Sequence, residues 1–294
     1  MLRTRRSSAV RFAATAMTLV SRTRNVPATT SLAKMMRGYA NTLEAACTVS
    51  ASVGVSFKEG KKDMKPFNSA VIWEGKSPYD GAEIMVLAVC IKDPSKNRKT
   101  GWMIQIYILV KSVSPVEAVR LGLDASVCGN CSMRWNNGGG CYVLPIWITP
   151  TWKKGLEAPR ITPTELAKLA NKYNTPIRQG AWGDPAFVPM DVWEELENAV
   201  SNKKGSSYTH QWEWVSPEYA KFSMASVENL KQKADAQAKG YRTYRIVDDE
   251  SEIVEDERLC LNSSRGIQCR ECGECGGNRS KASHRQKNIV IVRH

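Results

Sequence analysis

Residues 162–200 have the sequence TPTELAKLANKYNTPIRQGAWGDPAFVPMDVWEELENAV, in which a helix, a strand and a second helix follow one another. The Thr-Pro-Thr-Glu start predicts a capped helix from Thr162 to about Tyr173. A strand is expected at 177–182 and a second helix at about 189–200. Alternation of strands with helices of this length favours parallel βαβ units.

The same alternation continues toward the end of the chain. We expect strands at 208–212, 222–226, 241–247 and 289–292, and a helix at 227–239 that Gly240 ends. Residues 160–294 should therefore form a partial barrel or an open, mostly parallel sheet.

Upstream, the pattern is typical of an antiparallel meander. Apolar, β-branched runs at 71–73, 84–91 and 102–110 are separated by polar segments rich in Pro, Gly and Asp. Ser114 and Pro115 then predict a helix start that leads into the first cysteines. The expected class is α/β, with a basic tail at 1–43, an antiparallel β region at 44–127 and an α/β metal-binding domain at 128–294.

The formal net charge of +13 is concentrated in the tail. Residues 1–43 hold eight basic residues and no acid, so residues 44–294 carry only +5. Such a tail is typical of a targeting presequence, of an arm that binds nucleic acid, or of a poorly ordered N-terminus. No apolar run approaches the roughly 18 residues of a membrane-spanning helix. We therefore expect no membrane association and an intracellular protein.

Three of the nine cysteines form a first group. Cys128 and Cys131 are separated by two residues, so one turn can direct both sulfurs at one ion, and Cys141 follows a glycine-rich loop. Three thiolates are one short of a closed tetrahedral site. The fourth ligand must come from elsewhere or be exchangeable, and an open position of that kind favours reactivity.

Four further cysteines form a second group. Cys269, Cys272 and Cys275 repeat a two-residue gap, and Cys260 supplies a fourth thiolate. This spacing suits zinc and also an iron–sulfur cluster. Cys47 and Cys90 stand alone, and Cys90 is expected to be a small buried residue in a strand.

Other candidates lie at the carboxyl ends of predicted strands, where parallel sheets collect their ligands. Asp184 and His210 could act as acid and base, as metal ligands, or as binders of a cofactor's amine and hydroxyls, with Gln211 beside them. The alternative is that Asp184 caps a turn and His210 is an ordinary strand residue. The acidic run at 248–257 is expected to be a solvated loop or the start of an exposed helix, without chemistry.

Several blocks carry a resemblance. They are 95–101, 103–105, the Cys128, Cys131, Cys141 and Tyr142 block, 183–185, 208–212, 224–227 and the terminal cysteine loop. Together they resemble a family of uncharacterised phage-encoded cysteine-rich proteins, which implies the cytoplasm of a host cell.

A fainter similarity is to radical S-adenosylmethionine enzymes, in which loop cysteines hold a cluster at the top of a partial βα barrel. It implies an iron–sulfur cluster at Cys128, Cys131 and Cys141, with Tyr142 beside it and S-adenosylmethionine as a possible cofactor. The gaps here are two and nine residues, whereas those enzymes have three and two.

Two functions follow from these patterns. The first is a metal or iron–sulfur enzyme acting on a nucleotide or small molecule at the three-cysteine centre. The alternative is a zinc-stabilised protein that binds nucleic acid in phage replication or regulation, through the basic tail, residues 279–287 and stacking by Trp182, Trp212 and Trp214.

Overall fold

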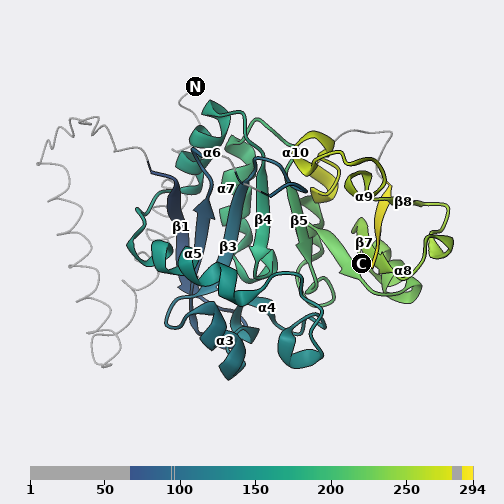
Figure 1. The fold of residues 1–294 in the computed structure, drawn as a ribbon, viewed down its shortest axis with the longest axis horizontal. Coiled ribbons are helices and arrows are strands. Elements are labelled where there is room, and N and C mark those ends of the chain that lie inside the picture. Colours follow the sequence, from purple (N-terminus) through teal and green to yellow (C-terminus); the bar gives the residue numbers. More distant parts are fainter. Residues whose placement is uncertain (1–66, 94, 96, 280–286, 294) are drawn as a thin grey trace, which may run out of the picture. The chain divides into compact units, whose positions relative to one another are not determined.

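The first three strands form the expected antiparallel meander at one side of the sheet (Figure 1). They are β1 (Ser69–Lys76), β2 (Glu83–Val89) and β3 (Ile104–Val110). The side chains of β2 and β3 are almost continuously buried, because both faces of this part of the sheet are covered, whereas β1 is buried only at 70–72. The computed structural model describes residues 67–93, 95, 97–279 and 287–293, so the predictions for the tail at 1–43 and for Cys47 lie outside it.

The remaining strands pair in parallel, as the alternating pattern predicted. They are β4 (Ile177–Trp182), β5 (Ser206–Thr209), β6 (Met224–Val227), β7 (Thr243–Val247), β8 (Glu257–Leu259) and β9 (Asn288–Val292). The order across the sheet is β1-β2-β3-β4-β5-β6-β7-β9-β8, so β9 inserts between β7 and β8. The sheet is open. The pairing of β3 with β4 joins the antiparallel and parallel regions within one compact unit, Met64–His294.

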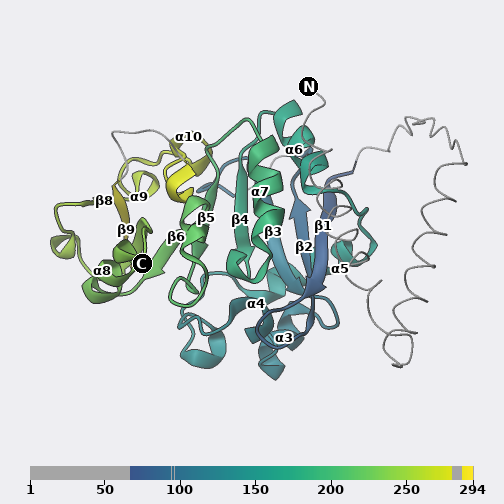
Figure 2. The same cartoon turned by 180° about the vertical axis from the view of Figure 1, so that it is seen from behind.

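Three helices cover one face of the sheet. They are α6 (Pro163–Lys172), α7 (Met190–Ala199) and α8 (Leu230–Ala238). Figure 2 shows α6 and α7 in front of the strands. The side-chain amide of Gln179 in β4 donates to Glu197 in α7 at 2.9 Å, which places Gln179 on this face.

A fourth long helix, α5 (Pro145–Glu157), covers the opposite face over β1 and β2. Its Gly155 lies so close to Leu87 that an added Cβ would be 2.9 Å from that side chain. The strand register shows which face this is. Leu87 pairs with Tyr107, so the two point to the same face, and Gln105, two residues from Tyr107, points there too. Gln105 pairs with Arg178, whose neighbour is Gln179. Because neighbouring residues of a strand point to opposite faces, Leu87 and α5 are on the face away from α7.

Over β4 to β7 this second face has no long helix. Arg178, Tyr208 and Tyr244 lie on it and are only half-buried. We call these three residues the open-face residues. Their partial exposure contrasts with the complete burial of Gln179, Ser207 and Thr243 on the helix-covered face.

The short helices stand at the two ends of the strands. α3 (Pro115–Leu121), capped by Ser114 as predicted, and α4 (Ala125–Cys128) follow β3, whereas α9 (Leu261–Arg265) and α10 (Cys269–Cys272) precede β9. Figure 1 places α4 and α10 at opposite ends of the strands.

Several boundaries differ from the sequence prediction. β5 ends at Thr209, so His210 and Gln211 follow the strand instead of belonging to it. α8 begins only at Leu230, because the side chain of Asn229 caps it. Cys90 lies just after β2, is half-buried and has a φ of 60°, so it is neither in the strand nor fully buried.

Candidate metal centre

The first cysteine group lies at the carboxyl ends of β4 and β5. α4 ends at Cys128, and the backbone N–H of Asp184, just after β4, donates to the carbonyl of Val127 at 2.7 Å. The side-chain amide of Gln211, just after β5, donates to the carbonyl of Cys128 at 2.9 Å. The structure therefore brings Cys128 to the loops that hold Asp184, His210 and Gln211, which are far away in the sequence.

Gly129 allows this close approach. A Cβ at this position would come within 2.6 Å of both the Gln211 Oε1 atom and the Phe187 ring, and its φ is +53°. Only glycine adopts such a conformation without strain and also leaves room for the neighbouring loops.

A buried ion pair fixes the loop that carries the three cysteines. The Arg134 guanidinium contacts both carboxylate oxygens of Asp124, at 2.9 and 2.7 Å, and donates to the carbonyls of Gly129 and Gly122 at 3.0 and 3.1 Å. The Arg134 and Asp124 side chains are 10% and 3% exposed. Sequence reasoning missed both residues, because isolated charged residues without a motif give no sign that they are buried.

Backbone hydrogen bonds give this loop its shape. The N–H of Cys131 donates to the carbonyl of Cys128 at 3.2 Å, and the N–H of Cys141 donates to the carbonyl of Met133 at 2.9 Å. These bonds turn the chain twice between Cys128 and Cys141. The loop is therefore folded locally rather than extended across its glycines.

Burial disfavours ionisation of all three thiols of this group. Burial raises the pKa of Cys128 well above its usual value, and the charges of Cys131, Asp124 and Cys141 raise it further. Burial raises the pKa of Cys131 to about 12, and that of Cys141 is also raised. A bound cation would reverse this effect, since it stabilises the thiolates that neighbour it.

Asp184 joins the two loops that meet this group. Its carboxylate accepts from the backbone N–H of Ala186 at 3.0 Å and from that of His210 at 2.7 Å. Burial raises its pKa to about 6, although these hydrogen bonds oppose the shift. Asp184 thus caps the turn after β4, which is one of the two roles that the sequence predicted.

The side chains of His210 and Gln211, which follow β5, have different properties. Burial lowers the pKa of His210 to about 4, so its imidazole is neutral at pH 7, the form in which histidine binds metals, and is a weaker base than an exposed histidine. Both ends of the Gln211 amide are engaged, because its Oε1 atom also accepts from the Trp214 indole at 2.8 Å. Gln211 therefore holds Cys128 in position.

The second cysteine group lies toward the amino ends of β3 and β5. The N–H of Cys269 donates to the carbonyl of Lys99, before β3, at 3.1 Å, and the N–H of Ser207 in β5 donates to the carbonyl of Cys275 at 2.9 Å. Cys260 follows β8, and its N–H donates to Val290 at 2.8 Å. Segments separated by more than 150 residues are thereby joined around this group.

The four thiols of this group also share one electrostatic environment. Burial raises the pKa of Cys275 to about 12; the hydrogen bond with Tyr208 opposes the shift, and the charges of Cys260, Cys269 and Cys272 add to it. The rings of Tyr208 and Tyr244 stand 4.6 Å apart beside Cys275. The group therefore packs on the open face of the sheet.

As placed, no three His, Cys, Asp or Glu side chains in the described part of the chain are arranged to hold one metal ion. Tyr142, beside Cys141, is 60% exposed.

Of the three tryptophans expected to stack on nucleic-acid bases, two are buried and one is exposed. Trp182 and Trp212 are buried, at 6% and 3% exposed, so the prediction that they stack on bases is wrong, whereas Trp214 is 49% exposed. The basic tail and residues 280–286 lie outside the described residues.

In the residues that the structure describes, no helix has both the length and the apolar character needed to cross a membrane. No family model, curated protein or solved structure matches the chain.

Proposed function

We propose that the protein binds a metal ion or an iron–sulfur cluster at Cys128, Cys131 and Cys141, and that this centre acts on a small molecule or nucleotide. One observation supports the proposal: the loop that carries the three cysteines meets the carboxyl ends of two parallel strands, where the Gln211 side chain donates to the carbonyl of Cys128 at 2.9 Å. This is the edge at which open α/β sheets bind their ligands.

The open coordination position is the reason to propose an enzyme. Three thiolates leave one position for an exchangeable ligand. His210 is a candidate for it because its imidazole is neutral at pH 7. S-adenosylmethionine is the exchangeable ligand that the resemblance to radical enzymes implies, with Tyr142 at the rim of the site.

We assign the second group a structural role. Cys260, Cys269, Cys272 and Cys275 supply four thiolates, which complete a tetrahedral zinc site or a cluster without any outside ligand. A metal here would hold α9 and α10 against β5 and β9, because the backbone of this group already bonds to both strands.

The test is anaerobic purification of the full chain, followed by metal analysis and an absorbance spectrum. Matched variants are Cys131→Ser in the first group, Cys272→Ser in the second and Cys90→Ser as control, since Cys90 belongs to neither group. We expect each of the first two variants to lose the metal of its own group and the control to keep both.

The identity of the metal decides between the chemistries. Iron, sulfide and broad visible absorbance that Cys131→Ser diminishes would support a reactive cluster, and addition of S-adenosylmethionine should then change the spectrum. A colourless protein that contains only zinc would exclude the iron–sulfur enzyme. Absence of metal from the wild-type chain would refute the proposal as a whole.

A further inference from the structure

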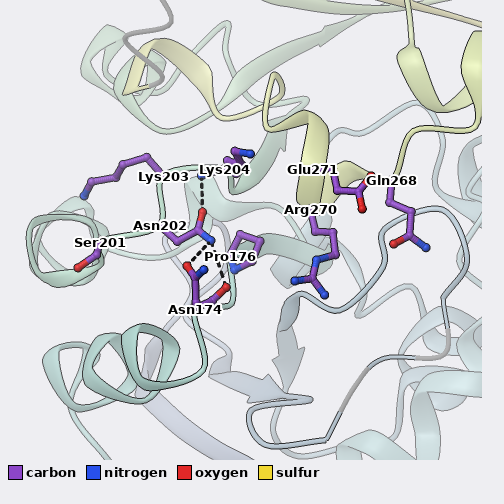
Figure 3. Close-up of a pocket in the computed structure, with 9 residues that line it drawn as sticks. All are labelled: Asn174, Pro176, Ser201, Asn202, Lys203, Lys204, Gln268, Arg270 and Glu271. Atoms are coloured by element: carbon purple, nitrogen blue, oxygen red, sulfur yellow. Dashed lines mark hydrogen bonds between the residues drawn. The ribbon is translucent and has the colours of Figure 1, made fainter.

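A polar pocket of about 550 Å³ lies at the amino ends of β4 and β5, at the other end of the strands from Cys128 (Figure 3). Three segments line it: residues 174–176 before β4, residues 201–204 before β5, and residues 268–271 of the second cysteine loop. Its volume lies within the roughly 300–1,000 Å³ that is usual for small-molecule sites.

The lining carries more positive than negative charge. Lys203, Lys204 and Arg270 contribute cations, and Glu271 contributes the one carboxylate of the lining. In Figure 3 the Glu271 side chain points toward Gln268, away from Asn174. Unbalanced positive charge within a concave site concentrates anions.

Two of these cations have no protein partner to neutralise them. Within the described residues, neither Lys204 nor Arg270 forms an ion pair or a side-chain hydrogen bond. Lys203 is different, because its ammonium group donates to the carbonyl of Glu197 at the end of α7. Lys204 and Arg270 therefore remain available to a ligand.

The pocket is held in shape by its own hydrogen bonds. The Asn202 amide donates to the backbone and side-chain oxygens of Asn174 at 3.2 and 3.1 Å and accepts from the N–H of Lys204 at 3.1 Å (Figure 3). Gly273 packs against Lys204, since a Cβ there would be 2.7 Å from the Lys204 Cγ atom. The two cations are thus carried by segments that are already fixed to one another, which lowers the entropic cost of binding.

We infer that this pocket binds the phosphate groups of a nucleotide-sized small molecule. Arg270 supplies a planar guanidinium that pairs with two phosphate oxygens, and Lys204 supplies a second, compact charge. The free side-chain donors of Asn174 and Ser201 complete the set, since neither has a protein acceptor within the described residues. This site is separate from the proposed three-cysteine centre and does not require it.

The inference is tested by calorimetric titration of the full chain, as purified, with inorganic pyrophosphate and then with ATP at physiological salt. We expect saturable binding that Lys204→Gln and Arg270→Gln each weaken about tenfold to a hundredfold, as for the loss of one charge-assisted hydrogen bond. Lys231→Gln is the matched control. It removes the same charge from α8, where Lys231 is exposed and paired with Asp235, and should leave the affinity unchanged.

Arg270 lies between two cysteines, so its variant is checked for unchanged metal content and secondary structure, and Lys204→Gln provides an independent test. Absence of saturable pyrophosphate binding by the wild-type chain would overturn the inference. So would an equal loss in Lys231→Gln, which would indicate general charge attraction. A single-stranded oligonucleotide whose binding Lys204→Gln and Arg270→Gln weaken, when neither pyrophosphate nor ATP binds saturably, would overturn it in favour of a nucleic-acid surface.

Discussion

Replacement of Arg134 by methionine should strongly destabilise the loop that carries Cys128, Cys131 and Cys141. Methionine keeps most of the side-chain length but leaves the carboxylate of Asp124, which is 3% exposed, without its counter-ion. It also removes the donors that satisfy the carbonyls of Gly122 and Gly129.

The magnitude follows from burial. Loss of one partner from a buried ion pair costs about 3–5 kcal/mol, because a desolvated charge is left behind. At about 2–4 °C per kcal/mol for a chain of this size, the melting temperature should fall by roughly 10 °C. Arg120→Met is the matched control, since its ion pair with Glu117 is on the surface, with side chains 65% and 47% exposed, and it should change the melting temperature far less.

The assay is thermal unfolding followed by circular dichroism, together with the double variant Asp124→Leu/Arg134→Met. Replacement of both partners by apolar residues removes the unpaired charge, so the double variant should be more stable than Arg134→Met. A fall in melting temperature no larger than that of Arg120→Met would refute the argument that this pair fixes the loop. So would a double variant less stable than the single one.

Two further predictions concern other parts of the fold. Burial raises the pKa of Glu257, but its hydrogen bonds with the Arg245 guanidinium, at 2.8 and 2.6 Å, outweigh this and leave the pKa below its usual value. A carboxyl with a lowered folded-state pKa stabilises the protein above its unfolded-state pKa, and this contribution is lost as the pH falls through the folded-state value. Melting temperatures between pH 7 and pH 3 should therefore fall on acidification, and Glu257→Gln should flatten that dependence; an unchanged slope would contradict the assignment. Gly129→Ala should lower the melting temperature more than Gly240→Ala. Both positions have a positive φ, but only Gly129 has neighbours within 4 Å of an added Cβ. Equal effects in the two variants would show that the Gln211 contact tolerates displacement.

Local signals predicted the parallel half of the fold well. The strand expected at 177–182 is β4 to the residue, and the helix expected after Thr162 begins there because a capping box between Thr162 and Glu165 forms. Both depend on neighbours in the sequence, and such information is present in one chain.

The elements that sequence reasoning missed depend on long-range packing. α5 contains Pro150 and two threonines, which disfavour a helix locally, and its stability comes from contacts such as that of Gly155 with Met85 and Leu87. The acidic run at 248–257 was expected to be solvated throughout, and this was wrong for its last residue. Glu257 starts β8 and is buried against Arg245 and Lys233, a burial that only the fold determines.

The candidate site was predictable in its parts but not in its arrangement. Spacing separated the cysteines into two groups, and the carboxyl ends of the predicted strands pointed to Asp184 and His210. The sequence did not indicate that α4 would bring Cys128 to those same ends, because that contact depends on Gly129 and on the hydrogen bond from Gln211.

The two cysteine groups are joined electrostatically, although they bond to opposite ends of the strands. Arg178 lies between them on the open face of β4, and its charge opposes the rise in pKa of Cys141 in one group and of Cys269 in the other. α6, α7 and α8 all cover the other face, and α5 covers only the antiparallel end. On the face that carries Arg178, Tyr208 and Tyr244, the two tyrosines are therefore packed beside Cys260 and Cys275 of the second group instead of beneath a long helix.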